Sequence, residues 1–439
     1  MASAGVYIIG LLGVIVRVIL MNSYLPKWLQ TRNEVVTPIT SWNNVEEGFS
    51  LQDQLVSPYS GDLFHETPLA LRGLRIAHYF PYGVSGFFMF IDVLTMVFLY
   101  KIAAPFAKYL LCNQEEEKKN YSTKADSLVL TGNYLSWLPI MVVAMHALNP
   151  FSIMTTLAAS TAALTNLAVL IAFYNMVIDN RLLSTLFIAV ASYQSLYPIV
   201  FIVPAALHFY KNSCKSSPVS YTSKDSVCSF AETLSIFGMF LGLLIGFSFL
   251  AEKSWDFLFS TYGFILSVPD LTPNIGVFWY FFTEMFEHFR TLFVCVFQLN
   301  AVAYTFPLAI KFTEKPFFLL YVLIFLTSIF KSYPSYGDTA LYFSLLPLWS
   351  HVFPYMRNTL VVGGMYICSV ILAPILYHLW IFAGSANANF YFAITLVYST
   401  AQIFLVTDVI FAYLRREFDL YHGTEHVNPD GTKARIKLD

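Results

Sequence analysis

Long runs of hydrophobic residues, separated by short polar segments, make up most of this chain. A helix needs about 20 residues to cross the hydrocarbon core of a bilayer. An apolar region at residues 182–210 is interrupted by the sequence Tyr193-Gln-Ser-Leu-Tyr-Pro198. The pattern predicts an all-α polytopic membrane protein. The clearest uninterrupted runs are residues 5–21, 82–104, 128–148, 153–178, 230–251, 289–310, 316–330, 339–356, 359–382 and 390–414.

The interruption at residues 193–198 predicts a break in a membrane helix. Proline has no backbone N–H, and its ring clashes with the preceding helical turn. We therefore expect two short helices in residues 182–210, for a total of about twelve membrane helices, some too short to span alone. Broken helices persist at membrane depth only where protein buries them or where they line a cavity. Residues 193–198 are thus predicted to pack against neighbouring helices or to line a lipid cavity.

Lys and Arg are distributed unevenly among the polar segments. With the N-terminus placed in the cytosol, the cytosolic segments hold sixteen Lys and Arg residues and the opposite segments hold six. Cytosolic loops of membrane proteins carry such an excess. We therefore predict that both termini are cytosolic and that the number of membrane helices is even.

The two longest polar segments outside the termini define the predicted organisation. Residues 1–414 form one polytopic membrane domain, and residues 415–439 form a cytosolic tail. Residues 22–81 and 252–288 are then lumenal loops. A long lumenal loop after the first helix is an architecture of polytopic glycosyltransferases that use lipid-linked sugars, so we expect a glycosyltransferase-C-like bundle.

Composition excludes several classes of protein. Charged residues make up 12% of the chain and hydrophobic residues 57%, whereas a soluble domain carries about 25% charged residues. Too few charges are present to cover a soluble globule, and the hydrophobic content excludes intrinsic disorder. The net charge of −2 indicates no nucleic-acid partner. The five cysteines form no C-x-x-C pair, so no disulfide framework or zinc ribbon is predicted.

The first lumenal loop contains four carboxylates that are candidates for catalysis or metal binding. A glycosyl transfer to a lipid-linked acceptor needs a carboxylate as general base or metal ligand. The loop contains no Asp-x-Asp pair, and such side chains also commonly cap turns and short helices. This ordinary structural role is favoured. The candidates are Glu46, Glu47, Asp62 and Glu66, with His65 nearby.

The second lumenal loop offers a three-residue cluster. If the segment is helical, Glu284, Glu287 and His288 share one face and suit a metal ion. Only three ligands are offered, and the H-E-x-x-H and H-x-x-E-H signatures are absent. The aromatic residues 278–282 are typical of an interfacial belt. A structural or partner-binding role is therefore favoured, and we expect neither a metal nor a cofactor.

Three lysines in a predicted cytosolic loop could hold an anionic lipid headgroup. They are Lys211, Lys215 and Lys224. Ordinary cytosolic-loop lysines are the favoured interpretation.

Several sequence blocks resemble one family of membrane proteins. Ser57-Pro-Tyr-Ser-Gly, Phe64-His-Glu-Thr-Pro-Leu69 and Tyr193-Gln-Ser-Leu-Tyr-Pro198 resemble PIG-U, the U subunit of the glycosylphosphatidylinositol (GPI) transamidase complex. The blocks run from residue 57 to residue 417, so the resemblance covers nearly the whole chain. Further blocks are Tyr262-Gly-Phe-Ile-Leu-Ser-Val-Pro-Asp-Leu-Thr-Pro-Asn-Ile-Gly276, Phe278-Trp-Tyr-Phe-Phe282, Glu284-Met-Phe-Glu-His-Phe289, Phe330-Lys-Ser-Tyr-Pro334, Gly384-Ser-Ala-Asn-Ala-Asn389 and Leu414-Arg-Arg-Glu417.

The resemblance implies a non-catalytic subunit in the endoplasmic-reticulum membrane. In that complex, a caspase-like cysteine protease subunit cuts a proprotein and transfers the new carboxyl end to the ethanolamine amine of a GPI lipid. PIG-U-like subunits are thought to help recognise the GPI lipid and to scaffold the complex together with accessory membrane subunits. They are related in architecture to the GPI mannosyltransferases.

Two other functions stay open at this point. One is a glycosyltransferase that uses a dolichol-phosphate sugar, with Glu46, Glu47 or Asp62 as the acidic group. The other is a transporter or lipid flippase that uses the broken helices around Pro198.

Asn387 and Asn389 are the predicted GPI-binding residues. They lie in a short turn on the predicted lumenal side, between runs 359–382 and 390–414. An amide offers two donors and an acceptor, which suits sugar hydroxyls and phosphate oxygens without burying a charge. Asn is also a common turn residue, and Asn389 could simply cap the last helix. The resemblance favours the binding role because this turn belongs to one of the matching blocks.

Overall fold

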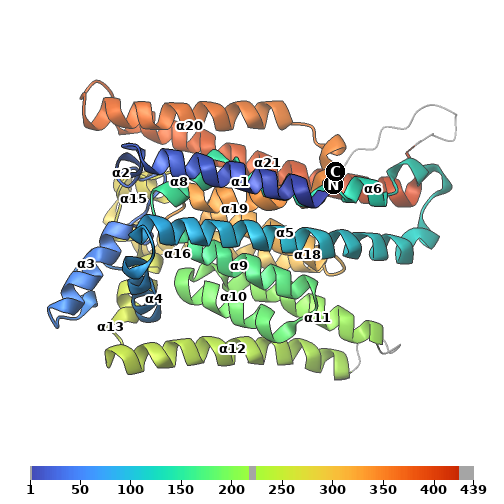
Figure 1. Cartoon of the computed structure of the whole chain (residues 1–439), viewed down its shortest axis with the longest axis horizontal. Coiled ribbons are helices and arrows are strands. Elements are labelled where there is room, and N and C mark those ends of the chain that lie inside the picture. The colour runs from blue at the N-terminus through green and yellow to red at the C-terminus, as the bar shows by residue number, and fades with distance from the viewer. Residues whose placement is uncertain (1, 217–223, 425–439) are drawn as a thin grey trace.

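The protein is a bundle of helices. The computed structural model describes residues 2–216 and 224–424, and the side chains of residues 4–213 and 227–424. Helices run in both directions along the long axis (Figure 1). The described residues contain helices and connecting turns but no β-strand, so the predicted all-α architecture is confirmed.

Six helices are long and apolar enough to cross a membrane within the described part of the chain. The count becomes seven if two short helical segments, Thr123–Leu135 and Leu138–Ala147, bent by 68°, form one span. The structure thus confirms a multi-pass arrangement but not about twelve spans. The long helices are α1 (Ala2–Met21), α5 (Gly83–Glu117), α12 (Lys224–Glu252), α16 (Arg290–Ala303) continued by α17 (Thr305–Lys311), α20 (Thr359–Ile381) and α21 (Ala388–His422).

The other apolar runs are divided into shorter helices, several of which have proline in their first turn. Proline suits this position because its missing N–H would have no helical partner there. Pro150 and Pro316 begin α8 and α18 in this way. The shorter helices are η4 (Thr123–Leu128), α6 (Gly132–Leu135), α7 (Leu138–Ala147), α8 (Pro150–Leu157), α9 (Ala162–Val177), α18 (Pro316–Phe330), α19 (Tyr336–Leu345) and η8 (Leu346–Tyr355).

The predicted break in residues 182–210 is confirmed. Helix α10 (Arg181–Ser195) ends at Leu196, whose φ of 60° departs from helical geometry. A 3₁₀ turn, η5 (Tyr197–Phe201), then leads into α11 (Ile202–Ser216). The positive φ of Leu196 and the following Pro198 therefore separate α10 from α11.

The two long loops are themselves folded into short helices. Both lie at the left end of the bundle in Figure 1, which we call the loop end. The first loop contains α2 (Leu25–Leu29), α3 (Trp42–Asp53), η1 (Pro58–Ser60), α4 (Pro68–Leu74) and η2 (Arg75–Tyr79). The second contains α13 (Asp256–Leu258), η6 (Phe259–Gly263), α14 (Phe264–Ser267), α15 (Phe278–Glu284) and η7 (Glu287–Phe289).

The start of α1 and the end of α21 lie at the opposite end, which we call the termini end (Figure 1). This agrees with an even number of crossings. Helix α5 reaches Glu117 and is followed by η3 (Lys118–Asn120), so the predicted loop 105–127 is largely helical. Helix α21 likewise continues to His422, into the segment predicted as a tail.

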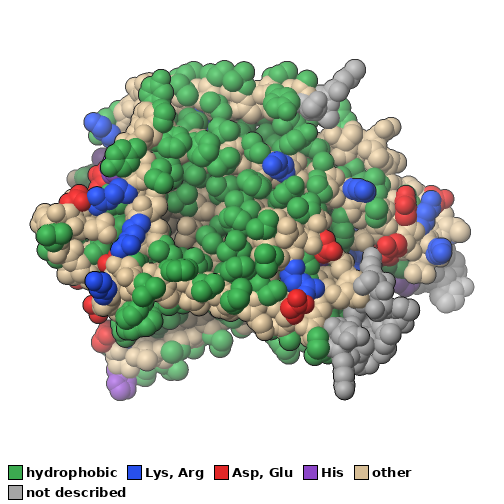
Figure 2. Space-filling model, turned by 60° about the horizontal axis from the view of Figure 1, so that its bottom comes forward, with side chains coloured by type: hydrophobic (Ala, Val, Ile, Leu, Met, Phe, Trp, Pro, Cys, Tyr) green, Lys and Arg blue, Asp and Glu red, His purple; other side chains and the backbone are tan. Residues whose placement is uncertain are grey.

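The surface separates apolar from charged residues. Hydrophobic side chains cover the middle of the face in Figure 2, and most charged side chains lie toward its two ends. Such a band is expected where lipid hydrocarbon surrounds a helix bundle.

Candidate functional site

An open groove of about 710 Å³ lies at the loop end, between the first and the second loop. Small-molecule sites typically have volumes of about 300–1,000 Å³. We call it the loop groove. The first loop supplies Tyr59, Ser60, Gly61, Asp62 and His65, and the second supplies Phe259, Ser260, Gly263, Phe264, Ser267, Pro269 and Asp270.

His65 joins the two walls of the loop groove. Its Nδ1 lies 2.8 Å from the carbonyl oxygen of Ser260, and its ring stacks on Phe264 with centroids 3.5 Å apart. Burial lowers the pKa of His65, and the hydrogen bond to Ser260 opposes that shift. A neutral ring has one N–H, and donation from Nδ1 satisfies the Ser260 carbonyl.

The charge of the loop groove comes from two aspartates. Asp62 is exposed, and its carboxylate has no hydrogen bond or ion pair within the described side chains. One carboxylate oxygen of Asp270 accepts from the backbone N–H of Thr272 at 2.7 Å and from its hydroxyl at 2.5 Å. No Lys or Arg is among the residues that line the groove. The groove is therefore acidic.

Glu66, the residue after His65, is buried and does not line the loop groove. The Thr161 hydroxyl donates to its carboxylate at 2.5 Å, and Tyr59 donates to its backbone carbonyl at 2.9 Å. Burial raises the pKa of Glu66 to about 7, against the opposing effect of the Thr161 hydrogen bond. Glu66 thus fastens the first loop to the turn between α8 and α9.

The other acidic candidates of the first loop do not line the groove. Glu46 accepts a hydrogen bond from the indole N–H of Trp42 at 2.7 Å. Both Glu46 and Glu47 belong to α3. Of the five candidates, only Asp62 and His65 meet in the groove. Asp270, which completes it, was not among the candidates because no sequence spacing relates it to Asp62.

The shared helical face considered for Glu284, Glu287 and His288, which was disfavoured as a metal site, does not form. Helix α15 ends at Glu284, and Met285 is extended before η7 begins at Glu287. The three side chains therefore do not share one helical face. No group of three or more His, Cys, Asp or Glu residues suited to a metal ion occurs within the described residues.

The aromatic residues 278–282 pack inside the protein more than the belt prediction implies. Phe278, Trp279 and Phe282 are buried. Trp279 stacks on Trp380 and contacts Tyr391, which places α15 against α20 and α21. The buried aromatic residues of α15 therefore have a structural role in packing.

Asn387 and Asn389 are exposed at the loop end, at the start of α21. The side-chain oxygen of Asn387 accepts from the backbone N–H of Asn389 at 3.1 Å, so Asn387 is the helix cap. The side-chain oxygen of Asn389 accepts from the hydroxyl of Tyr280. Each amide therefore retains its NH₂ donors at the surface.

Residues 193–198 pack against neighbouring helices and the first loop, as predicted for a packed break. The Tyr193 hydroxyl accepts from the backbone N–H of Leu69 at 3.2 Å and contacts the Ser248 hydroxyl. Tyr197 donates to Gln298 at 2.8 Å. These bonds link α10 and η5 to the first loop, α12 and α16.

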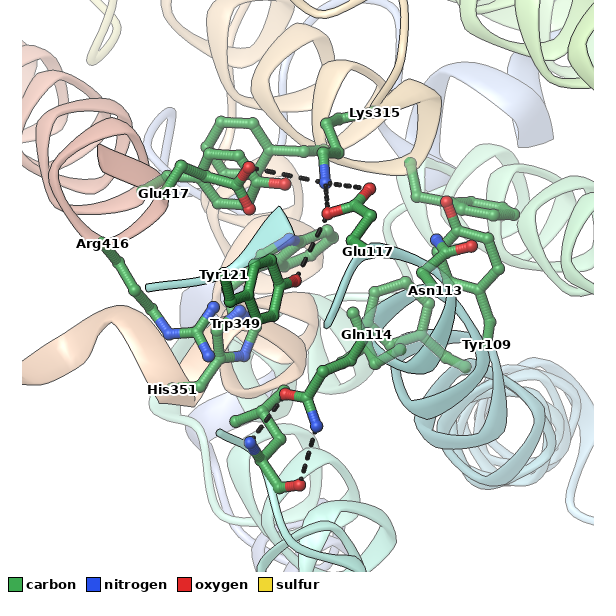
Figure 3. A pocket seen from close by; sticks show the side chains of 16 residues that line it. Tyr109, Asn113, Gln114, Glu117, Tyr121, Lys315, Trp349, His351, Arg416 and Glu417 are labelled. Atoms are coloured by element: carbon green, nitrogen blue, oxygen red, sulfur yellow. Dashed lines mark hydrogen bonds and ion pairs between the residues drawn. The ribbon is translucent and has the colours of Figure 1, made fainter. Parts of the chain in front are cut away.

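A second pocket, at the termini end, is shown in Figure 3. Its volume is about 50 Å³, enough for one or two water molecules, which occupy about 30 Å³ each in the liquid. Lys315 pairs with Glu117 at 3.0 Å and with Glu417 at 3.4 Å (Figure 3). Arg416 donates to the carbonyl of Leu128 at 2.8 Å. The charged residues of this pocket thus hold α5, α18 and α21 together.

Of the three lysines considered for an anionic lipid headgroup, only Lys211 has a described side chain, and it is paired. The Lys211 ammonium pairs with the Glu314 carboxylate at 2.9 Å. It also donates to the Glu314 carbonyl at 2.8 Å. The side chains of Lys215 and Lys224 lie outside the described residues.

The fold and surface define a multi-pass membrane protein with an open groove at the end away from its termini. A family model described as PIG-U, GPI transamidase subunit PIG-U, matches residues 11–398. The chain belongs to this PIG-U family. The GPI transamidase is a complex of the endoplasmic reticulum, and membership places the chain among its subunits.

Relatives from distant organisms match along almost the full length. The human protein named GPI-anchor transamidase component PIGU is 42% identical over 438 residues, covering 99% of this chain and 100% of the relative. The yeast Saccharomyces cerevisiae protein named GPI transamidase component GAB1 is 29% identical, covering 93% of this chain and 94% of the relative.

A partial similarity extends to an enzyme family. The Dictyostelium discoideum protein named GPI mannosyltransferase 1 is 25% identical over 155 residues, covering 32% of this chain and 34% of the relative.

Proposed function

We propose that this chain recognises the GPI lipid and scaffolds the GPI transamidase without performing the chemical step. The observation that carries the proposal is the loop groove, whose volume and mixed polar and aromatic lining suit a glycan. The membrane helices accept the acyl chains. Holding the lipid beside a partner's nucleophile lowers the barrier by positioning alone.

Asn387 and Asn389 form a second contact in this proposal. Their amide N–H groups donate to sugar hydroxyls or phosphate oxygens without bringing a negative charge near the phosphates. Both residues are exposed at the loop end, at the start of α21, which supports a common ligand for the groove and the turn.

The proposed orientation places the loop end in the lumen and both termini in the cytosol. It rests on the excess of Lys and Arg in the segments assigned to the cytosol. The proposed partners are the caspase-like catalytic subunit and the accessory membrane subunits of the complex. Residues 1–414 act as one membrane domain.

A photo-crosslinking experiment tests the proposal. A GPI lipid that carries a photoreactive group on its glycan is added to the purified complex, and the crosslinked peptides are identified. We expect peptides from residues 57–66 and 259–270 of this chain, at a level that excess unlabelled GPI reduces. Labelling confined to other subunits would reject the GPI-recognition role.

The alternative is a glycosyltransferase that uses a dolichol-phosphate sugar, favoured by the partial similarity to a GPI mannosyltransferase. Asp62 is the acidic candidate that lies in the loop groove. Sugar transfer by the isolated chain, lost on changing Asp62 to Asn by about 10²- to 10⁴-fold, would establish this function. Transamidase activity of the complex with no sugar transfer supports the main proposal.

A further inference from the structure

We infer that the loop groove is a subsite for a protonated primary amine on a glycan, with Asp62 and Asp270 as the two groups that receive it. The inference rests on the proposed function, because the amine is placed on the GPI lipid. Within that lipid, the groove selects the part that carries the amine.

The charge of the groove favours a cation. Two carboxylates line it, and no Lys or Arg does. His65 adds no positive charge because burial lowers its pKa. Phosphate groups would be repelled from such a lining, so the phosphates of the ligand lie outside the groove and its amine lies inside.

The carboxylates of Asp62 and Asp270 both have hydrogen-bond acceptor sites that no described group occupies. Each carboxylate offers about four lone-pair sites on two oxygens. Asp62 uses none of these sites with a described side chain. Asp270 uses one oxygen for its bonds to Thr272, which leaves the other oxygen free. An ammonium has three donors, enough for one bond to each of the two carboxylates that line the groove.

The aromatic lining also favours an amine-bearing sugar. The Phe259 side chain is 78% exposed although it lines the groove. An exposed ring face attracts a cation within about 6 Å, and it also covers the apolar face of a sugar ring. The hydroxyls of Ser60 and Ser267 add neutral partners for sugar hydroxyls. An aliphatic or anionic ligand would use few of these groups.

The assembled complex is tested for its selectivity between two probes. One is a GPI lipid with its free amine, and the other is the same lipid after N-acetylation, which removes the positive charge. We expect the wild-type complex to bind the free-amine probe about tenfold more tightly. We also expect the preference for the free-amine probe to weaken as the salt concentration rises, because ions screen the attraction between the ammonium and carboxylates in an open groove.

The variant that removes the acidic pair is Asp62→Asn with Asp270→Asn, which keeps both side-chain shapes. Affinity for the free-amine probe should fall about tenfold, and affinity for the acetylated probe should change less than twofold. Asp256→Asn is the matched control, because Asp256 lies in the same loop, bonds to Ser254 and does not line the groove. The single change Asp62→Asn retains the Asp270 turn and gives a smaller loss if the double variant fails to assemble.

Other outcomes reject the inference in distinguishable ways. Equal binding of both probes by wild type, unaffected by the double variant, rejects the amine subsite but leaves GPI recognition standing. Binding of neither probe rejects the proposed function itself. A lysine-containing peptide that competes with the free-amine probe only in complexes with intact Asp62 and Asp270 would assign the groove to a protein substrate instead.

Discussion

Arg17 and Asp92 form an ion pair inside the bundle, with 2.9 Å between Nε of the guanidinium and the carboxylate. The side chains are 0% and 4% exposed. His146 also contacts Asp92, at 3.0 Å. Arg17 donates further to the Ala147 carbonyl at 2.7 Å and to Ser152 at 2.5 Å. Little of α1 is buried within the bundle, so the ion pair and the Arg17 hydrogen bonds are a main attachment of α1 to α5 and α7.

Changing Arg17 to Ala should destabilise the folded chain strongly. Loss of one partner leaves the Asp92 charge buried without compensation, which costs about 3–5 kcal/mol. The measurement is the fraction of chain that stays monodisperse in detergent after heating. Arg75→Ala is the control, because the exposed Arg75–Asp53 pair at 2.8 Å should contribute about 1 kcal/mol or less.

A second variant separates charge from packing. Arg17→Met with Asp92→Asn removes both charges and retains most of the volume, so it should recover part of the stability lost in Arg17→Ala. If Arg17→Ala behaves like Arg75→Ala, the buried pair does not hold α1.

Glu66 should make the stability of the protein depend on pH. Burial raises its folded-state pKa to about 7, from the usual value of 4.5. The folded state therefore keeps a proton that the unfolded state loses, and stability falls as pH rises from 4.5 to 7 and is level above it. The whole change is about 3 kcal/mol. Thermal unfolding of the complex at pH 5, 6, 7 and 8 measures it.

The variant Glu66→Gln should remove this dependence and stabilise the protein above pH 7. Its amide oxygen can still accept from Thr161, the partner seen at 2.5 Å. Glu47→Gln is the control and should leave the profile unchanged, since Glu47 is only half-buried and lies outside the groove. A Glu66→Gln profile that matches wild type at all four pH values would contradict a buried, proton-retaining carboxyl.

Local signals in the sequence predicted local features well. Pro198 indicated the break after α10 because proline acts on its own helical turn. Pro150 and Pro316, which begin α8 and α18, lie where the predicted runs were already separate. Hydrophobicity alone joined α8 to α9 in the run 153–178 and α19 to η8 in the run 339–356. The helical face considered for Glu284, Glu287 and His288 does not form, since α15 ends at Glu284.

Contacts between distant segments could not be predicted from spacing. Asp62 and His65 were candidates as neighbours in one loop, but Asp270 lies about two hundred residues away and meets them only through the fold. Arg17 was visible as a charge inside an apolar run, yet its partner Asp92 was not. Pairings of this kind depend on how helices pack, which a single sequence does not specify.

The orientation can be tested with one introduced glycosylation site. Gln54→Asn with Val56→Thr creates an N-x-T sequon in the exposed segment after α3. In the proposed orientation this site faces the lumen and should be glycosylated, seen as a mobility shift that a glycosidase reverses. The natural sequon at Asn120 should stay unmodified, so Asn120→Gln should not change mobility. Modification of Asn120 alone would invert the proposed orientation.

The proposed contact of Asn387 and Asn389 with the GPI lipid can be separated from helix capping. Asn387→Asp keeps an acceptor for the N–H of Asn389, the bond of 3.1 Å that caps α21, and acidic residues stabilise helix starts. The same change removes the NH₂ donors and places a negative charge where a phosphate would bind. We therefore expect normal assembly of the complex and fewer GPI-anchored proteins at the cell surface. Asn387→Ser keeps the cap without the charge and should reduce surface levels less. Normal surface levels for Asn387→Asp, in cells that lack the native subunit, would leave Asn387 as a helix cap alone.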